Sequence, residues 1–189
     1  MEELRYLRST QGDISDIGWD EKIDYFLSGY ERVCRAAKGR INAILGVELR
    51  LNETQSDYLI YGVDEAFLRA NPDMMDIRLR DIYPIVREAG GLFIQAHPFR
   101  NFIAVSPPDM IDGVEVCNLN ARHDSRNDIA AIWAKKFSLI ETSGGDYHRR
   151  GDIENCGGIM TEVEIKSGEQ LVSVLRSGEY KIICPAGER

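Results

Sequence analysis

The stretch Thr142-Ser143-Gly144-Gly145-Asp146-Tyr147-His148 follows the apolar run Phe137-Ser138-Leu139-Ile140 and carries an aspartate and a histidine two positions apart. If the run continues as a strand, alternation places Asp146 and His148 on the same side. If the strand has already ended, the glycines allow a turn that both residues share. Either way, a carboxylate oxygen and an imidazole nitrogen converge as a divalent metal requires. An isolated Asp-x-His is more often a capping aspartate and a surface histidine, so its surroundings decide its meaning.

Polar residues also stand in or after neighbouring apolar runs. Residues 41–51 predict a buried strand that contains Glu48, and residues 92–96 predict a short strand that runs into His97 and Pro98. A further strand ends at Asn118. Taken singly, Glu48 is as well explained as an alternating surface residue, and His97 as a hydrogen-bonded structural histidine. The repetition of the pattern favours a shared site.

Amphipathic helices alternate with these strands. Periodic apolar residues predict helices over residues 19–40 and 77–89, although Pro84 counts against the first half of the second. Ser167 is placed to cap a later helix. Residues 1–18 form a polar lead-in, and we expect residues 1–189 to make a single domain. Alternating strands and helices indicate an α/β fold, in which chemistry gathers at the carboxyl ends of parallel strands.

Composition narrows the classes of function. The chain has a net charge of −8, whereas a nucleic-acid binder should show a basic face, so nucleic acid is not the expected partner. The sequence contains no apolar run near the roughly 20 residues that span a bilayer and no secretory pattern, so we expect a cytoplasmic protein. Its four cysteines form no Cys-x-x-Cys pair, and we expect them to be reduced, with Cys117 in the core.

Four segments, in this order, resemble the PHP (polymerase and histidinol phosphatase) family. They are Gly46-Val47-Glu48, Ala96-His97-Pro98, Gly113-Val114-Glu115-Val116 and Ser143-Gly144-Gly145-Asp146-Tyr147-His148. The resemblance covers essentially the whole chain. It implies a distorted (β/α)7 TIM-like barrel with one to three divalent metal ions, Zn, Mn or Fe, at the carboxyl ends of its strands. It also implies hydrolysis of phosphoesters.

The resemblance assigns roles to individual residues. It implies that Glu48 is a bridging carboxylate between metals and that His97, Asp146 and His148 are further metal ligands, with Glu48 and Asp146 at the centre of catalysis. It places Arg100 and His123 in loops on the same rim, where they are candidate phosphate-binding residues. Both are equally well explained as solvated loop residues.

The chain departs from the family pattern at its amino-terminal side. The family begins with a His-x-His strand and soon adds an Asp-His pair, whereas the first histidine here is His97. We therefore expect a PHP-type barrel that lacks its first βα unit or units. A barrel opened in this way exposes sheet edges, and we expect it to form a homo-oligomer.

Three functional hypotheses follow. The first is a metal-dependent hydrolase of phosphoesters acting on a small phosphorylated metabolite or nucleotide, in which cations activate water and clamp phosphate oxygens. The second is a non-catalytic or truncated PHP-like domain with a vestigial metal site. The third, an amidohydrolase-type barrel acting on a C–N bond, is disfavoured because no candidate metal-bridging lysine stands at a strand end. Sequence signatures of serine nucleophiles, phosphate loops and dinucleotide binding are absent.

Overall fold

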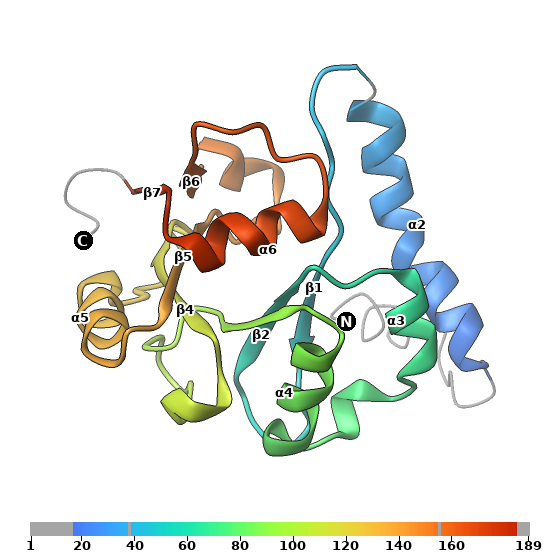
Figure 1. Cartoon of the computed structure of the whole chain (residues 1–189), viewed down its shortest axis with the longest axis horizontal. Coiled ribbons are helices and arrows are strands. Elements are labelled where there is room, and N and C mark those ends of the chain that lie inside the picture. The colour runs from blue at the N-terminus through green and yellow to red at the C-terminus, as the bar shows by residue number, and fades with distance from the viewer. Residues whose placement is uncertain (1–16, 38, 155, 185–189) are drawn as a thin grey trace.

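A five-stranded mixed sheet forms the centre of the molecule, and a two-stranded antiparallel sheet lies beside it (Figure 1). The computed structural model describes residues 17–37, 39–154 and 156–184. The strands are β1 (Gly46–Arg50), β2 (Asp57–Tyr61), β3 (Leu92–Gln95), β4 (Gly113–Asn118), β5 (Ile140–Gly144), β6 (Gly158–Met160) and β7 (Lys181–Ile183). The α-helices are α2 (Trp19–Ala37), α3 (Glu65–Ala70), α4 (Leu79–Glu88), α5 (Asn127–Phe137) and α6 (Gly168–Ser177). The 3-10 helices are η1 (Met74–Asp76), η2 (Pro108–Met110) and η3 (Arg150–Glu154).

The main sheet is open, and the predicted barrel is wrong. Its strands lie in the order β1-β2-β3-β4-β5, and among the described residues no ladder joins β1 to β5. Only β3–β4 and β4–β5 are parallel, whereas β2 runs antiparallel to both β1 and β3. The short connection over residues 51–56 explains the first of these reversals, because two parallel neighbours need a crossover of a dozen or more residues. The α/β class holds, but the all-parallel barrel does not.

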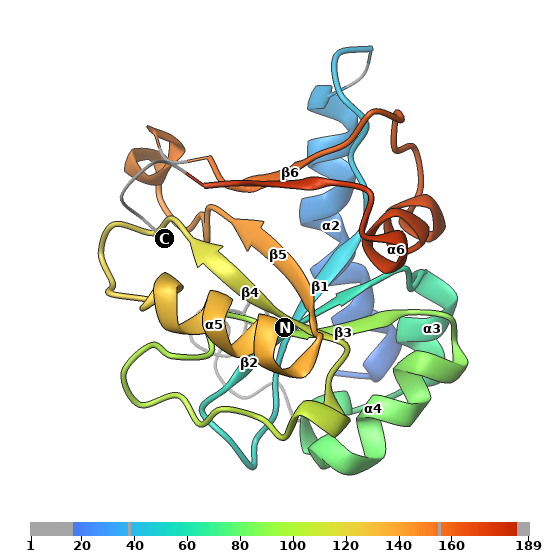
Figure 2. The same cartoon turned by 60° about the vertical axis from the view of Figure 1, so that its left-hand side comes forward.

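Each face of the main sheet is covered by different helices. Helices α2, α4 and α5 pack on one face, where Ile23, Ile82, Val86 and Ala134 join the main core cluster. Helix α6 packs on the opposite face, where Val172 and Leu175 meet Leu92 and Ile94 of β3. Figure 2 shows β4 and β5 running between α5 on one side and β6 on the other. The two covered faces leave the strand ends free for polar residues.

The predicted helices form, with adjusted ends. The expected helix over residues 19–40 is α2, which ends at Ala37, and the cap at Ser167 is confirmed because its side chain accepts a hydrogen bond from the Gln170 amide. Pro84 lies inside α4, which begins two residues later than predicted. The strand expected over residues 41–51 is shorter, since regular pairing is confined to β1. The polar lead-in over residues 1–18 falls almost entirely outside the described residues.

A disulfide bond corrects the expectation of four reduced cysteines. Cys117 in β4 is bonded to Cys184, which directly follows β7, while Cys34 is a free cysteine and Cys156 takes no part in this bond. Cys117 is fully buried, as predicted. The two partners are 67 residues apart in sequence, so spacing alone gave no sign of the pairing.

Within the described part of the chain, no helix combines the length and apolar character needed to cross a membrane.

Candidate functional site

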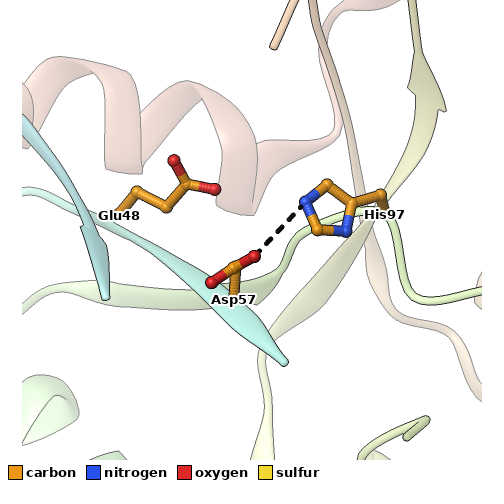
Figure 3. A group of neighbouring side chains, drawn as sticks. All are labelled: Glu48, Asp57 and His97. Atoms are coloured by element: carbon orange, nitrogen blue, oxygen red, sulfur yellow. Dashed lines mark ion pairs between the residues drawn. The ribbon is translucent and has the colours of Figure 1, made fainter. Parts of the chain in front are cut away.

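Three side chains from neighbouring strands converge at one end of the main sheet (Figure 3). They are Glu48 in the middle of β1, Asp57 at the start of β2, and His97 shortly after β3. Because β2 runs against its neighbours, its first residue lies beside the carboxyl ends of β1 and β3. The carbonyl of Asp57 accepts a hydrogen bond from Ala96, which sets Asp57 next to His97.

The three side chains offer a donor set that fits a divalent cation. One ligand atom from each of Glu48, Asp57 and His97 lies within 4.8 Å of the other two. His97 Nε2 is 3.7 Å from Asp57 Oδ2, which is too long for a hydrogen bond. Ligand atoms bound at about 2.0–2.2 Å to one tetrahedral ion lie roughly 3–4 Å apart, so this gap suits an ion held between them. Two carboxylates and one imidazole suit Zn²⁺, Mn²⁺ or Fe²⁺.

His97 is held in the form that binds metals. Burial and the charge of Arg100 lower the pKa of its imidazole to about 4, against the attraction of Asp57 and Asp146, so the ring is neutral at pH 7. Its Nδ1 atom is buried, and no residue in the described part of the chain forms a hydrogen bond with it. Its backbone has a φ of 30°, in the left-handed region that non-glycine residues seldom adopt. Such backbone strain is found preferentially at functional sites.

Asp57 already has a cationic partner. Arg50 lies opposite it across the β1–β2 ladder and donates from Nε and Nη2 to the two carboxylate oxygens. A carboxylate has further lone pairs, so this contact leaves Asp57 able to share an oxygen with a cation. It also fixes the carboxylate in position, as hydrogen-bonded outer residues do for metal ligands.

Glu115 holds the backbone of His97 in place. Its Oε2 atom accepts hydrogen bonds of 2.9 Å from the His97 amide and from the Asn118 side chain. Burial raises the pKa of the Glu115 carboxyl to about 7, although both hydrogen bonds act in the opposite direction. A Cβ atom on Gly144 would lie 2.9 Å from its Oε1 atom, so a larger residue at this point of β5 would displace the Glu115 carboxylate.

A second cluster adjoins the first and contains the residues that opened the sequence analysis. Asp146 Oδ1 lies 2.7 Å from His148 Nε2, and Asp146 Oδ2 accepts a 2.7 Å hydrogen bond from Arg100 Nη2. Burial would raise the pKa of Asp146, but the hydrogen bond and charge of Arg100, with His97 and His148, lower it to about 2. Asp146 is therefore a carboxylate that is already neutralised by an arginine.

The loop that follows β5, and not the strand itself, brings Asp146 and His148 together. Strand β5 ends at Gly144, and the two residues lie in the loop that follows. Asp146 has a φ of 45°, a left-handed conformation that aspartate tolerates better than most residues. The amides of His148 and Arg149 both donate to Asp152, which closes the loop. Of the two alternatives that the sequence left open, the strand is wrong, because both residues lie in the loop beyond the end of β5.

The predicted site residues divide into three groups. Glu48 and His97 meet in the triad, and Asp146, His148 and Arg100 form the adjoining cluster. His123 is exposed in the turn after Asn120, and no ion pair or side-chain hydrogen bond in the described residues joins it to either cluster. Asp57 was not predicted as a site residue, because we looked for ligands at the carboxyl ends of strands. Its alternation with Leu59 and Tyr61, on the face that carries Glu48, was the available signal.

No family model matches this chain, and no curated protein matches it either. The resemblance to the PHP family therefore rests on the four segments quoted above.

Proposed function

We propose that this protein is a metal-dependent hydrolase of phosphoesters. The observation that carries the proposal is the convergence of Glu48, Asp57 and His97 on a single point, with ligand atoms within 4.8 Å of one another. The four PHP-like segments suggest the phosphoester as substrate, and Arg100 offers a guanidinium suited to its phosphate. We infer a small phosphorylated substrate and not a nucleic acid, because a protein that binds nucleic acid should show a basic face and this chain has a net charge of −8.

The residues of this chain would divide the work as follows. Glu48, Asp57 and His97 hold the divalent cation, which when bound supplies Lewis acidity and a water of lowered pKa. The neutral imidazole of His97 is ready to coordinate without first losing a proton. Arg50 and Glu115 position Asp57 and His97 respectively. Arg100 binds and orients the phosphate oxygens near the cation.

The experiment measures metal content and hydrolysis together. The protein is loaded with Mn²⁺ or Zn²⁺, dialysed and analysed for bound metal, and hydrolysis of p-nitrophenyl phosphate is followed with the same samples. We expect Asp57→Asn and Glu48→Gln each to weaken metal binding about tenfold or more and to abolish hydrolysis. Asp128→Asn, which changes an exposed carboxylate of α5, is the matched control and should behave as wild type. If Asp57→Asn and Glu48→Gln both retained as much metal as wild type, the proposal would be refuted.

A second function has one observation in its favour. Asp57 and Asp146 are each paired with an arginine, Arg50 and Arg100, so the site is charge-compensated by the chain itself. A non-catalytic domain stabilised by these pairs would bind no metal. In that case, Asp57→Asn should lower stability without changing metal content, which separates the two proposals.

A further inference from the structure

Arg100 sits where the two clusters meet. Its Nη2 atom donates to Asp146 at 2.7 Å and also lies 3.0 Å from Asn118 Oδ1 and 3.3 Å from Ser125 Oγ. The side chain of Arg100 is 15% exposed and that of Asp146 is 7% exposed, so solvent screens their attraction only weakly. The pair should therefore contribute more to stability than an exposed ion pair does.

Both oxygens of Asp146 are engaged. One accepts from Arg100, and the other lies against His148 Nε2. A cation approaching Asp146 must therefore compete with a guanidinium that already neutralises the carboxylate. Because breaking a buried pair leaves an uncompensated charge, Asp146 can leave Arg100 only when something else compensates both partners.

Arg100 has donor capacity left over. Its Nε atom is buried and has no hydrogen-bond partner among the described residues. The planar guanidinium presents its donors as a fork that matches two oxygens of a phosphate-like anion. An anion that took this fork would compensate the arginine, while a divalent cation would compensate the released carboxylate.

We propose, building on the proposed function, that Arg100 and a divalent cation compete for Asp146, and that a phosphate-like oxyanion relieves this competition by binding Arg100. The oxyanion draws the guanidinium away, and the Asp146 carboxylate, with His148 beside it, becomes available to a cation. Oxyanion and metal then bind cooperatively, and by linkage each strengthens the other by the same factor. Arg100 would thus couple substrate binding to completion of the metal site.

This role predicts an effect of unusual sign. If Arg100 only supported the fold of the site, its removal would weaken metal binding. If it competes with the cation, its removal frees a buried carboxylate, and metal binding becomes tighter. Arg122 offers a control for the loss of an arginine near this loop. It forms a 3.1 Å ion pair with Asp152, and in the part of the chain that the structure describes no hydrogen bond or ion pair joins it directly to Asp146 or to the triad.

The test is a calorimetric titration with Mn²⁺ of wild type, Arg100→Gln and Arg122→Gln, each with and without inorganic phosphate. Phosphate should tighten Mn²⁺ binding to wild type and to Arg122→Gln about tenfold. Arg100→Gln should bind Mn²⁺ about tenfold tighter than wild type without phosphate, and phosphate should add little. Asp146→Asn should lose the phosphate effect, because the contested ligand is gone.

Two results separate this inference from the proposed function. If wild type binds Mn²⁺ through Asp57 but folded Arg100→Gln binds it no more tightly, the competition is refuted and the metal site stands. If wild type binds no Mn²⁺ with or without phosphate, both fall. Should Arg100→Gln fail to fold, Arg100→Lys replaces it, since lysine keeps the charge but lacks the fork. A phosphate effect in Arg100→Lys equal to that in wild type would also refute the inference.

Discussion

Glu115 carries a charge at neutral pH only against a penalty from burial, and this gives it a recognisable pH signature. Burial raises the pKa of its carboxyl from an ordinary 4.5 to about 7. Since the folded-state pKa is the higher one, its stabilising contribution is complete below about pH 4.5 and is lost as the pH rises through about 7. His97 acts in the opposite sense. Its pKa is lowered from 6.5 to about 4, so its contribution is present above pH 6.5 and is lost as the pH falls towards 4.

Substituting Glu115 by Gln should separate these opposing effects. The variant keeps an oxygen for the His97 amide but cannot ionise. As the pH is raised from 5 to 8, its free energy of unfolding should therefore increase relative to that of wild type. One pKa unit corresponds to 1.36 kcal/mol, so the relative gain is at most roughly 3 kcal/mol. Urea unfolding in chelator at several pH values measures it. Parallel stability curves for the two proteins would show that Glu115 does not titrate in this range.

Motif spacing and the PHP resemblance named five of the residues that the structure brings together, but neither named Asp57. Glu48, His97, Arg100, Asp146 and His148 all belong to the two clusters. Asp57 escaped because its place depends on the direction of β2, which is set by a short connection and not by the composition of the strand. The pairing of Asp146 with Arg100 was equally hidden, since it joins residues 46 positions apart.

At the level of the elements, α4 contains a feature that weakens it. Pro84 lies inside the helix and is exposed, so its ring fills no core space. Proline has no amide hydrogen, and its ring crowds the carbonyl four residues earlier, which here belongs to Arg80. The helix nevertheless forms because Ile82 and Val86 are fully buried in the main core. Periodicity thus predicted α4 correctly, because the burial of its apolar side chains outweighs the cost of Pro84 within the helix.

Pro84→Ala should therefore stabilise the protein. Alanine restores the missing hydrogen bond and relieves the crowding, at the loss of the restraint that proline places on the unfolded chain. We expect the free energy of unfolding to rise by about 1–2 kcal/mol and Tm by a few degrees. Thermal unfolding followed by circular dichroism gives the result, with Arg80→Ala, an exposed change in the same helix, as the control. A lower Tm for Pro84→Ala would mean that the proline sets a geometry that α4 requires.

At the scale of the whole molecule, the open sheet shows the limit of reasoning from a pattern of alternating elements. Periodicity predicted several of the strands and helices, but strand direction depends on which neighbours pair, and β1 and β2 pair across a short connection. The two-stranded sheet of β6 and β7 could not be predicted either, because its strands are separated by α6 and pair over a distance that periodicity does not reveal. It lies next to β5, where the Ser143 hydroxyl donates to the Ile183 carbonyl.

The disulfide bond should be the main link between the β6–β7 sheet and the main sheet. It joins Cys184, which follows β7, to Cys117 in β4 of the main sheet, and it closes a loop between residues 67 positions apart. A link of this kind restricts the unfolded chain, so Cys184→Ser should lower the free energy of unfolding by about 2–4 kcal/mol in urea. Reductant should destabilise wild type and Cys34→Ser alike, because Cys34 is free, and should leave Cys184→Ser unchanged. Thiol titration of the denatured, unreduced protein should find two thiols from the four cysteines, because Cys117 and Cys184 are bonded to each other. If all four cysteines reacted, the bond would be absent. The β6–β7 sheet would then have to be held by its hydrogen bonds and by Ile159, which packs against the cluster of Leu92, Ile94, Val172 and Leu175.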